Sequence, residues 1–393
     1  MMSWLLQLAI TPPPDATDGG GNRPSQRSET TGDTTMSFLK SWRTGAAVLA
    51  LGALALTGCS GGSPDSDAAH GEGEPISIAL SNGFVNGWRL TLINQVEKVT
   101  DELQEQGVVS DFSSVNAPGE NSATEQASQI RSLMLEDPDV LVVIPASSTA
   151  LVPVVEEACA ADITVIVLDA DMDAPCATIV RNDYAKWGEV SLQPALDAID
   201  GEGNIVLNRG VIGSQPDEEF YARQQEMLTD YPDVEVAAEI KGFCDSSTAQ
   251  KEITGMLGSL PEVAAVPGCI GGMGIVQAFE SADREAPVVV FDTDGKSLKY
   301  WQESGIDNGS FSALTDPGQG VAAIYVALEK LAGEDVPEEL ILPLVEITQD
   351  DLDYWVENLS ADEYAAYPWD EESVSAAIDA VNAGEDAEAP AIR

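Results

Sequence analysis

From residue 75 onward, short apolar runs alternate with longer stretches in which apolar residues recur at helical spacing. Continuous apolar runs such as 140–145 (VLVVIP) and 164–169 (TVIVLD) are typical of strands that are buried on both faces. Helices between such strands cover the two faces of a parallel sheet. The pattern predicts strands over 76–81, 108–115, 140–145 and 164–169, and helices over 88–106, 123–135 and 150–160.

The alternation starts again near residue 177, so the chain contains two successive runs of strand–helix units. Two such runs indicate an α/β protein with two doubly wound parallel-sheet lobes. The second run predicts strands over 177–180, 204–209, 234–240, 263–266 and 288–292. It predicts helices over 184–199 and 217–228, a helix that follows 234–240 and ends at about 257, and a helix that follows 263–266 and ends at 281. Later stretches predict a helix over 320–331, a strand over 340–346 and a very acidic helical region over 350–383.

The charge balance excludes several classes of partner. The 393 residues include 18 Lys and Arg against 67 Asp and Glu, a formal charge of −49, yet 44% are hydrophobic, which is ordinary for a folded protein. Such a charge repels nucleic acid and anionic lipid headgroups. The single histidine, His70, leaves little room for histidine catalysis or a histidine-ligated metal. We therefore expect no nucleic-acid partner, no metal and no cofactor.

The region that begins at Met36 has the three parts of a secretion signal. Lys40 and Arg43 form a basic start, 44–56 is a small and apolar run of 13 residues, and Leu-Thr-Gly-Cys ends at Cys59. The apolar run is shorter than the roughly 20 residues of a membrane-spanning helix. The Leu-Thr-Gly-Cys motif resembles a bacterial lipobox, in which Cys59 would be lipidated and become the mature N-terminus. The alternative is an ordinary signal peptide with a chance cysteine.

Residues 1–58 are therefore interpreted as a doubtful N-terminal extension followed by a lipoprotein signal peptide from about residue 36. The low-complexity composition of 1–35 leaves open whether Met1 or Met36 is the true start. Residues 59–75 are rich in Gly, Ser and Asp, a composition that suits a flexible tether.

Four cysteines remain after Cys59, and an even number in an exported protein suggests disulfides. Four cysteines allow three pairings, of which the sequence favours the two that link nearby segments, while free buried thiols are the alternative. The favoured pairs are Cys159 with Cys176 and Cys244 with Cys269.

A series of fragments carries a family resemblance. In order they are 76–80 followed by Asn86-Gly87-Trp88, then 142–145 (VVIP), 164–169 (TVIVLD), Tyr221-Ala222-Arg223, 274–279 (GIVQAF) and 289–292 (VVFD). Together they resemble ribose-binding-protein-like solute receptors, the type I periplasmic binding proteins of sugar ABC importers. The resemblance covers about 75 to 350 and implies two lobes that are joined by a three-crossing hinge and close on a sugar. The implied N-terminal lobe is 76–180 plus 315–333 and the C-terminal lobe 181–314 plus 334–350, followed by an acidic helical extension over 351–393.

The resemblance also implies a set of ligand-binding residues. Asn86 and Trp88 fall on the family's asparagine and first stacking aromatic residue, whereas Arg89 replaces the second aromatic residue. Asp169 matches a sugar-binding aspartate, and Asp171 can fill the space of an arginine that is Ala170 here. An aromatic face can stack on the C–H face of a sugar, and carboxylates form charge-assisted hydrogen bonds with hydroxyl groups.

In the second lobe, Tyr221 falls where the family has a ligand-binding arginine, Arg223 follows two residues later, and Asp292 matches the second-lobe aspartate. Ile270-Gly271 stand where the family has an Asn-Asp pair, and Leu314 stands where it has a hinge-region glutamine. We therefore expect a ligand other than ribose. Each candidate also has a structural interpretation: Trp88 as a core residue, the aspartates as helix caps and Arg223 as an exposed helix residue.

These observations predict a non-enzymatic, monomeric solute receptor that is anchored by a lipid to the outer face of the cell membrane. It would capture a sugar or polyol and deliver it to an ABC permease. The alternative is a sugar or autoinducer sensor that presents its ligand to a membrane kinase. A glycosidase with paired carboxylates is a third hypothesis, but the sequence shows no nucleophile motif for it.

Overall fold

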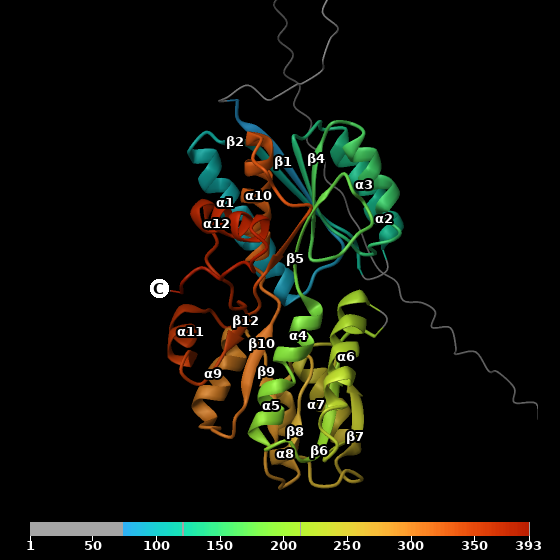
Figure 1. Cartoon of the computed structure of the whole chain (residues 1–393), viewed down its shortest axis with the longest axis vertical. Helices are drawn as coiled ribbons and strands as arrows, with labels where there is room; N and C mark the ends of the chain where they lie inside the picture. The colour runs from blue at the N-terminus through green and yellow to red at the C-terminus, as the bar shows by residue number, and fades with distance from the viewer. Residues whose placement is uncertain (1–73, 120–121, 213, 393) are drawn as a thin grey trace, which may run out of the picture. The chain divides into compact units, whose positions relative to one another are not determined.

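The computed structural model describes residues 74–119, 122–212 and 214–392 (Figure 1). The predicted signal region, Cys59 and most of the predicted tether lie outside the described residues. The described chain forms two six-stranded sheets, each flanked by helices. The predicted α/β class with two doubly wound parallel sheets is therefore confirmed.

The first sheet has the strand order β11-β5-β4-β3-β1-β2, and all its neighbours are parallel. Alternate residues of its central strands face opposite layers of helices, as strand geometry requires. Ala79 and Leu141 pack with α2 and α3, whereas Leu80 and Val142 pack with α1 and α10. The elements are β1 (Ile76–Asn82), α1 (Gly87–Glu105), β2 (Val109–Asn116), α2 (Ala123–Met134), β3 (Val140–Ile144), α3 (Val152–Cys159), β4 (Thr164–Leu168), β5 (Thr178–Asn182), α10 (Gln319–Ala332) and β11 (Glu339–Leu342).

The second sheet has the order β12-β10-β9-β8-β6-β7, with only the β10–β12 pair antiparallel. Leu207 and Val290 face α5 and α6, whereas Val206 and Phe291 face α7, α8 and α9. The elements are α4 (Tyr184–Val190), α5 (Gln193–Ala198), β6 (Gly203–Arg209), α6 (Gln215–Leu228), β7 (Val234–Lys241), α7 (Ser246–Met256), β8 (Ala265–Val266), α8 (Gly272–Ser281), β9 (Val288–Phe291), α9 (Gly295–Ser304), β10 (Phe311–Leu314) and β12 (Val345–Ile347).

The structure differs from the sequence-based expectation at several elements. Helix α9 and strand β10 were not predicted. The single helix expected over 184–199 is α4 and α5, because Pro194 starts a new helix in the first turn of α5. The single strand expected over 340–346 is two strands in different sheets, with Pro343 between them. Strand β11 pairs with β5, so these residues belong to the first sheet rather than to the second lobe.

The acidic C-terminal region also differs from a continuous solvated helix. It contains α11 (Leu352–Asn358) and α12 (Glu371–Asn382), separated by a non-helical stretch. Helix α11 packs on α9 and buries Trp355 in the core of the second sheet, whereas α12 packs on α10 and buries Ile378. Figure 1 shows α11 beside α9 and α12 beside α10. The region is therefore part of both cores rather than an appended surface helix.

The chain passes between the two sheets three times, as predicted: from β5 to α4, from β10 to α10 and from β11 to β12. The fully buried side chain of Asn182 joins all three crossings. Its Nδ2 donates to the carbonyl oxygens of Leu342 at 2.9 Å and Pro343 at 2.7 Å. Its Oδ1 accepts a 2.9 Å hydrogen bond from the backbone N–H of Asp316.

We expect Asn182→Ala to lower the free energy of unfolding by about 3 kcal/mol, because buried backbone groups that lose a partner cost about 1–3 kcal/mol each. Urea unfolding followed by intrinsic fluorescence measures the change. The control is Asn358→Ala, which removes an exposed hydrogen bond to the Tyr354 carbonyl and should change stability little. Equal stabilities of the two variants would contradict the role given to Asn182.

Candidate functional site

A polar cluster surrounds Asp169 where β4 ends. Asp169 Oδ2 lies 3.3 Å from Nη2 of Arg89, and its Oδ1 accepts hydrogen bonds from Tyr184 at 3.2 Å and Gln319 at 3.4 Å. The backbone of Asp169 has a φ of +56°, in the left-handed region. Its partners come from α1, α4 and α10, so the tertiary fold brings together groups that are distant in the sequence.

Arg89 is held at this cluster by the start of α1. The side chain of Asn86 caps the helix by accepting from the backbone N–H of Arg89 at 2.8 Å, which is the structural role expected of an N-cap residue. Only 6% of Arg89 is exposed, and Nη1 donates to Oδ1 of Asn82 at 2.9 Å. The guanidinium also lies 4.2 Å from the centre of the Phe84 ring.

Burial dominates the electrostatics of this cluster. It lowers the pKa of Arg89, while the charge of Asp169 acts in the opposite direction. It raises the pKa of Asp169, which Arg89 opposes, and raises the pKa of Tyr184 well above its usual value. A desolvated ion pair forms stronger hydrogen bonds than a solvated one, so this cluster is suited to holding hydroxyl groups.

Trp88 lies in the core and Asp171 at the surface. Trp88 is 9% exposed, lies in the apolar core and donates from Nε1 to the carbonyl oxygen of Thr315 at 2.9 Å. It therefore braces the crossing between β10 and α10. Asp171 is exposed to solvent and carries no ion pair among the residues that the structure describes. The binding roles of both residues remain predictions.

The second sheet presents Asp292 directly after β9. The residue is 3% exposed, and no hydrogen-bond partner is present for its Oδ2 in the described chain. Burial raises the pKa of Asp292 well above its usual value, and the neighbouring carboxyl groups of Asp294 and Asp245 raise it further. A buried carboxyl oxygen without a donor is costly, so this atom is suited to accept a hydrogen bond from a ligand.

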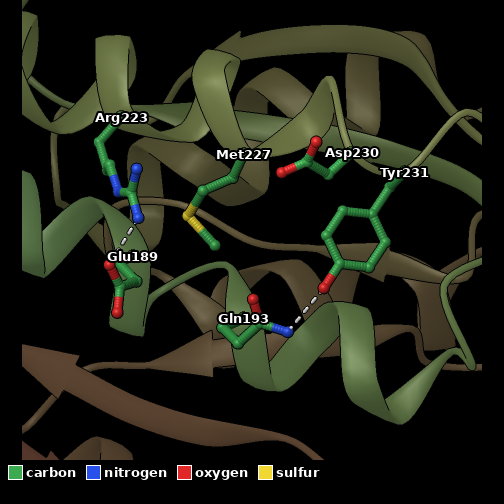
Figure 2. Close-up of a pocket in the computed structure, with 6 residues that line it drawn as sticks. All are labelled: Glu189, Gln193, Arg223, Met227, Asp230 and Tyr231. Carbon is green, nitrogen blue, oxygen red and sulfur yellow. Dashed lines mark hydrogen bonds and ion pairs between the residues drawn. The ribbon is translucent and has the colours of Figure 1, made fainter.

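Tyr221 and Arg223 belong to other groups. The Arg209 guanidinium stacks 3.5 Å from the centre of the Tyr221 ring, and the Tyr221 hydroxyl donates to Glu239. Arg223 forms ion pairs with Glu189 at 2.8 Å and with Glu226 at 2.9 Å. Figure 2 shows it lining a pocket formed by α4, α5, α6 and the residues after α6; the lining residues are Glu189, Gln193, Arg223, Met227, Asp230 and Tyr231.

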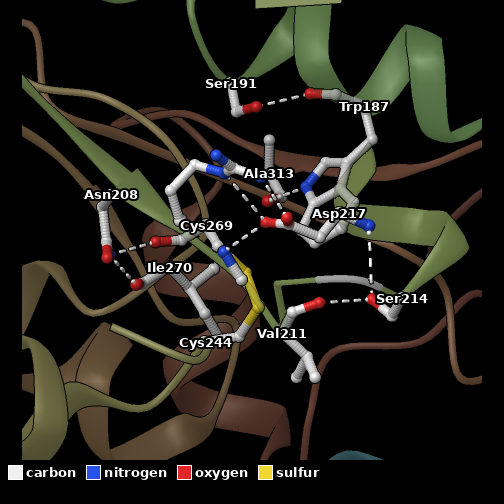
Figure 3. Close-up of a disulfide and its surroundings, with 12 residues drawn as sticks. Trp187, Ser191, Asn208, Val211, Ser214, Asp217, Cys244, Cys269, Ile270 and Ala313 are labelled. Carbon is white, nitrogen blue, oxygen red and sulfur yellow. Dashed lines mark hydrogen bonds and ion pairs between the residues drawn. A yellow bond between two sulfur atoms is a disulfide. The ribbon is translucent and has the colours of Figure 1, made fainter. Parts of the chain in front are cut away.

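Both predicted disulfides, Cys159–Cys176 and Cys244–Cys269, are present. The second one ties the loop after β7 to the loop after β8 (Figure 3). Beside it, the Asn208 side chain donates to the backbone carbonyls of Cys269 and Ile270. The carboxyl ends of three strands of the second sheet are thereby fixed together. Gly271 follows with a φ of +123°, a conformation that favours glycine and starts α8.

Sequence reasoning missed several residues of these groups. Asn82, Tyr184 and Gln319 contact Arg89 or Asp169, and Arg209 forms an ion pair with the buried Asp217. Asn82 and Arg209 could have been found, because each ends an apolar strand of a parallel sheet, where ligands bind. Tyr184 and Gln319 carry no such signal, since only the fold places them beside Asp169.

Two doubly wound sheets that are joined by three crossings, with polar groups beyond their strand ends, define the class of two-lobed solute-binding proteins. The chain belongs to this class: a family model for the periplasmic binding protein domain matches residues 78–335. The family resemblance found in the sequence, to type I periplasmic sugar-binding proteins of ABC transporters, is confirmed. It is a family of substrate-binding proteins and not of enzymes.

A solved ABC transporter solute-binding protein from Thermobispora bispora is 44% identical with a TM-score of 0.76, over 81% of this chain and 99% of its own. The xylitol-binding protein of Mycolicibacterium smegmatis is 26% identical over 61% of this chain and 69% of its own length. The ribose import binding protein of Bacillus subtilis is 22% identical over 77% of this chain and 97% of its own.

Two features are absent from the described residues. No helix within 74–119, 122–212 or 214–392 is long and apolar enough to cross a membrane. In the same part of the chain, no group of three His, Cys, Asp or Glu side chains is arranged to hold a metal ion.

Asp316 links the hinge to the C-terminal region. Its buried carboxylate accepts hydrogen bonds from the backbone N–H groups of Gly318 at 2.8 Å and Tyr367 at 3.1 Å, and from Nε1 of Trp369 at 2.8 Å. Burial raises the pKa of Asp316 to about 7, and these donors oppose the rise. Above this pKa the hinge therefore carries a desolvated negative charge.

Protonation of Asp316 should make the protein more stable at lower pH. Its pKa is about 7 in the folded state, and its ordinary value of 3.8 applies in the unfolded chain, so between these values only the folded protein binds the proton. This contribution to stability is complete below the ordinary pKa and is lost as the pH rises through the folded-state value. We expect the free energy of unfolding, taken relative to Asp316→Asn, to fall by about 2 kcal/mol from about pH 5 to about pH 8. Urea unfolding at several pH values tests this; parallel pH curves for the two proteins would contradict it.

Proposed function

We propose that this chain is the extracytoplasmic solute-binding lipoprotein of an ABC importer and that it captures an uncharged sugar or polyol. The observation that carries the proposal is the combination of the buried Arg89–Asp169 pair with the unpartnered Asp292 oxygen, in a chain of a substrate-binding family. We further propose that the protein works as a monomer, is anchored to the outer face of the membrane by a lipid and delivers its ligand to a membrane permease.

The polar groups fit a ligand that is rich in hydroxyl groups. Each hydroxyl group donates one hydrogen bond and can accept others, so different hydroxyl groups of one ligand can donate to Asp292 Oδ2 and to Asp169 and accept from Arg89. Hydrogen bonds to charged groups are about twice as strong as neutral ones. Micromolar affinity corresponds to roughly −8 kcal/mol, which a few such contacts can supply after the costs of ordering.

The charge of the protein disfavours an anionic ligand. The chain carries a formal charge of −49, and the carboxyl groups of Asp245 and Asp294 lie close enough to Asp292 to raise its pKa. An anion placed beside Asp292 would be repelled by the same neighbouring charges that raise the pKa of Asp292. This argument supports a neutral polyol or sugar over a sugar acid or sugar phosphate.

The proposed mechanism is ligand-driven closure of the two lobes about the three crossings. Asp169 lies at the end of the first sheet and Asp292 at the end of the second. A ligand can therefore contact both residues only when the two lobes are closed. Binding then shifts the population towards that arrangement, because a ligand favours the state for which its affinity is higher.

The unmodified protein should bind at least one member of a panel of xylitol, D-ribose, myo-inositol, D-allose and D-arabinose, measured by thermal shift and then by calorimetry. We expect Asp292→Asn to weaken that binding tenfold or more, because an amide offers one acceptor oxygen where the carboxyl group offers two. The control is Asp173→Asn, the same change at an exposed aspartate. Unchanged affinity of Asp292→Asn would remove Asp292 from the binding site.

The lipid anchor is tested at Cys59, which lies outside the described residues. When the full-length chain is expressed in a Gram-positive host, we expect the protein to partition into the detergent phase and to carry the mass of an acylated N-terminal cysteine. Cys59→Ala should move it to the aqueous phase, whereas Ser60→Ala should not. A soluble protein whose mature N-terminus is another residue would refute the lipobox interpretation and support the ordinary signal peptide.

A further inference from the structure

The stretch 359–370, between α11 and α12, lies outside the part of the chain that the family model matches. It runs along the residues that follow β9 and forms an isolated antiparallel bridge between Tyr364 and Asp294. The N–H of Gly295 donates to the Glu363 carbonyl at 3.0 Å, and the N–H of Ala365 donates to the Thr293 carbonyl at 2.9 Å. The backbone of Tyr364 is therefore fixed two residues beyond Asp292.

Tyr364 also contacts the other binding region, at the first turn of α1. Its N–H donates to Thr91 Oγ1 at 3.1 Å. A Cβ atom built on Gly87 would lie 3.0 Å from Cε2 of the Tyr364 ring and 3.5 Å from its hydroxyl oxygen. Gly87 stands between Asn86 and Trp88, so the ring occupies the space beside the turn that positions Arg89. A residue of the C-terminal region thus lies against both α1 and the end of β9.

The chemistry of Tyr364 is not explained by packing alone. The ring is half-buried and packs against the core, a role that phenylalanine would fill equally well. Its hydroxyl has no hydrogen-bond partner in the described part of the chain, and it is not among the buried polar atoms, so it is open to solvent or to a ligand. The backbone pairing of Tyr364 with Asp294 places the tyrosine near Asp292, and after burial the Asp292 carboxyl is the strongest influence that raises the pKa of Tyr364.

We propose that Tyr364 is a ligand-binding and specificity-determining residue that the C-terminal region adds to the site. The ring packs against the C–H face of the sugar or polyol, and the hydroxyl bonds a ligand hydroxyl group next to the one that donates to Asp292 Oδ2. An aromatic face and a neutral hydroxyl together favour a polyhydroxylated ligand with an exposed C–H face. This inference rests on the proposed function and adds a residue that lies outside the matched family region.

The decisive variant is Tyr364→Phe, which keeps the ring and removes only the hydroxyl group. We expect it to weaken calorimetric binding of the tightest probe among xylitol, D-ribose, myo-inositol, D-allose and D-arabinose about tenfold. Its urea unfolding curve should match that of the unmodified protein, because the hydroxyl has no hydrogen bond to lose within the described residues. Tyr364→Ala should weaken binding further, since it removes the aromatic face.

The matched control is Tyr300→Phe, which removes a hydroxyl that bonds the exposed Glu280 on α8 and should leave affinity unchanged. A second readout uses deoxy analogues of the tightest probe: for one of them the loss caused by Tyr364→Phe should vanish. If the substitution destabilised the fold, the unfolding curve would change, and the loss of affinity would not depend on one ligand hydroxyl group.

The outcomes separate this inference from the proposed function. If the unmodified protein binds a probe and Tyr364→Phe binds it equally well with every analogue, the inference is wrong while the proposed function stands. Tighter binding by Tyr364→Phe or Tyr364→Ala would show that Tyr364 competes with the ligand, which also overturns the inference. If the unmodified protein binds no member of the panel, the proposed function falls and the inference falls with it.

Discussion

The buried side chain of Asn182 is the constraint on which the arrangement of the chain depends. It is the last residue of β5, and its amide satisfies one donor and two acceptors that belong to the other two crossings. Each crossing leaves a sheet and exposes backbone groups that no strand neighbour can pair. The Asn182 side chain supplies hydrogen-bond partners to the two other crossings. The three crossings therefore form a single hydrogen-bonded unit rather than three independent linkers.

The C-terminal region extends this unit. Asp316 donates its backbone N–H to Asn182, and its carboxylate accepts from Trp369 and from the backbone of Tyr367. Three donors offset part of the cost of burying this carboxylate, and two of them come from beyond residue 366. The acidic region that follows β12 is thus coupled to the hinge, and helices α11 and α12 bury apolar residues against different sheets. This highly acidic region therefore contributes to both hydrophobic cores.

Asp169 and Asp292 are both buried carboxyl groups, but their surroundings compensate for burial differently. At the end of β4, Asp169 is buried beside a guanidinium and two neutral donors, so its charge is compensated within the protein. At the end of β9, Asp292 is buried beside two other carboxyl groups, and one of its oxygens has no partner among the described residues. The first group is preorganised, whereas the second lacks a donor that a ligand hydroxyl group can supply.

The sequence pattern predicted the α/β class and the two runs of strands, because buried strands leave continuous apolar runs. Both disulfide pairs were predicted because their cysteines lie in nearby segments, and the family was indicated by the order of the resembling fragments. The sequence also placed Asp169 and Asp292 at strand ends, since the strand pattern is local. It did not reveal α9, β10 or the split at Pro343, where the apolar runs are short and the pairing partner decides the sheet. Only the tertiary structure joined Tyr184 and Gln319 to Asp169, and Tyr364 to Gly87, because these contacts span 15 to 277 residues along the chain and leave no local periodicity.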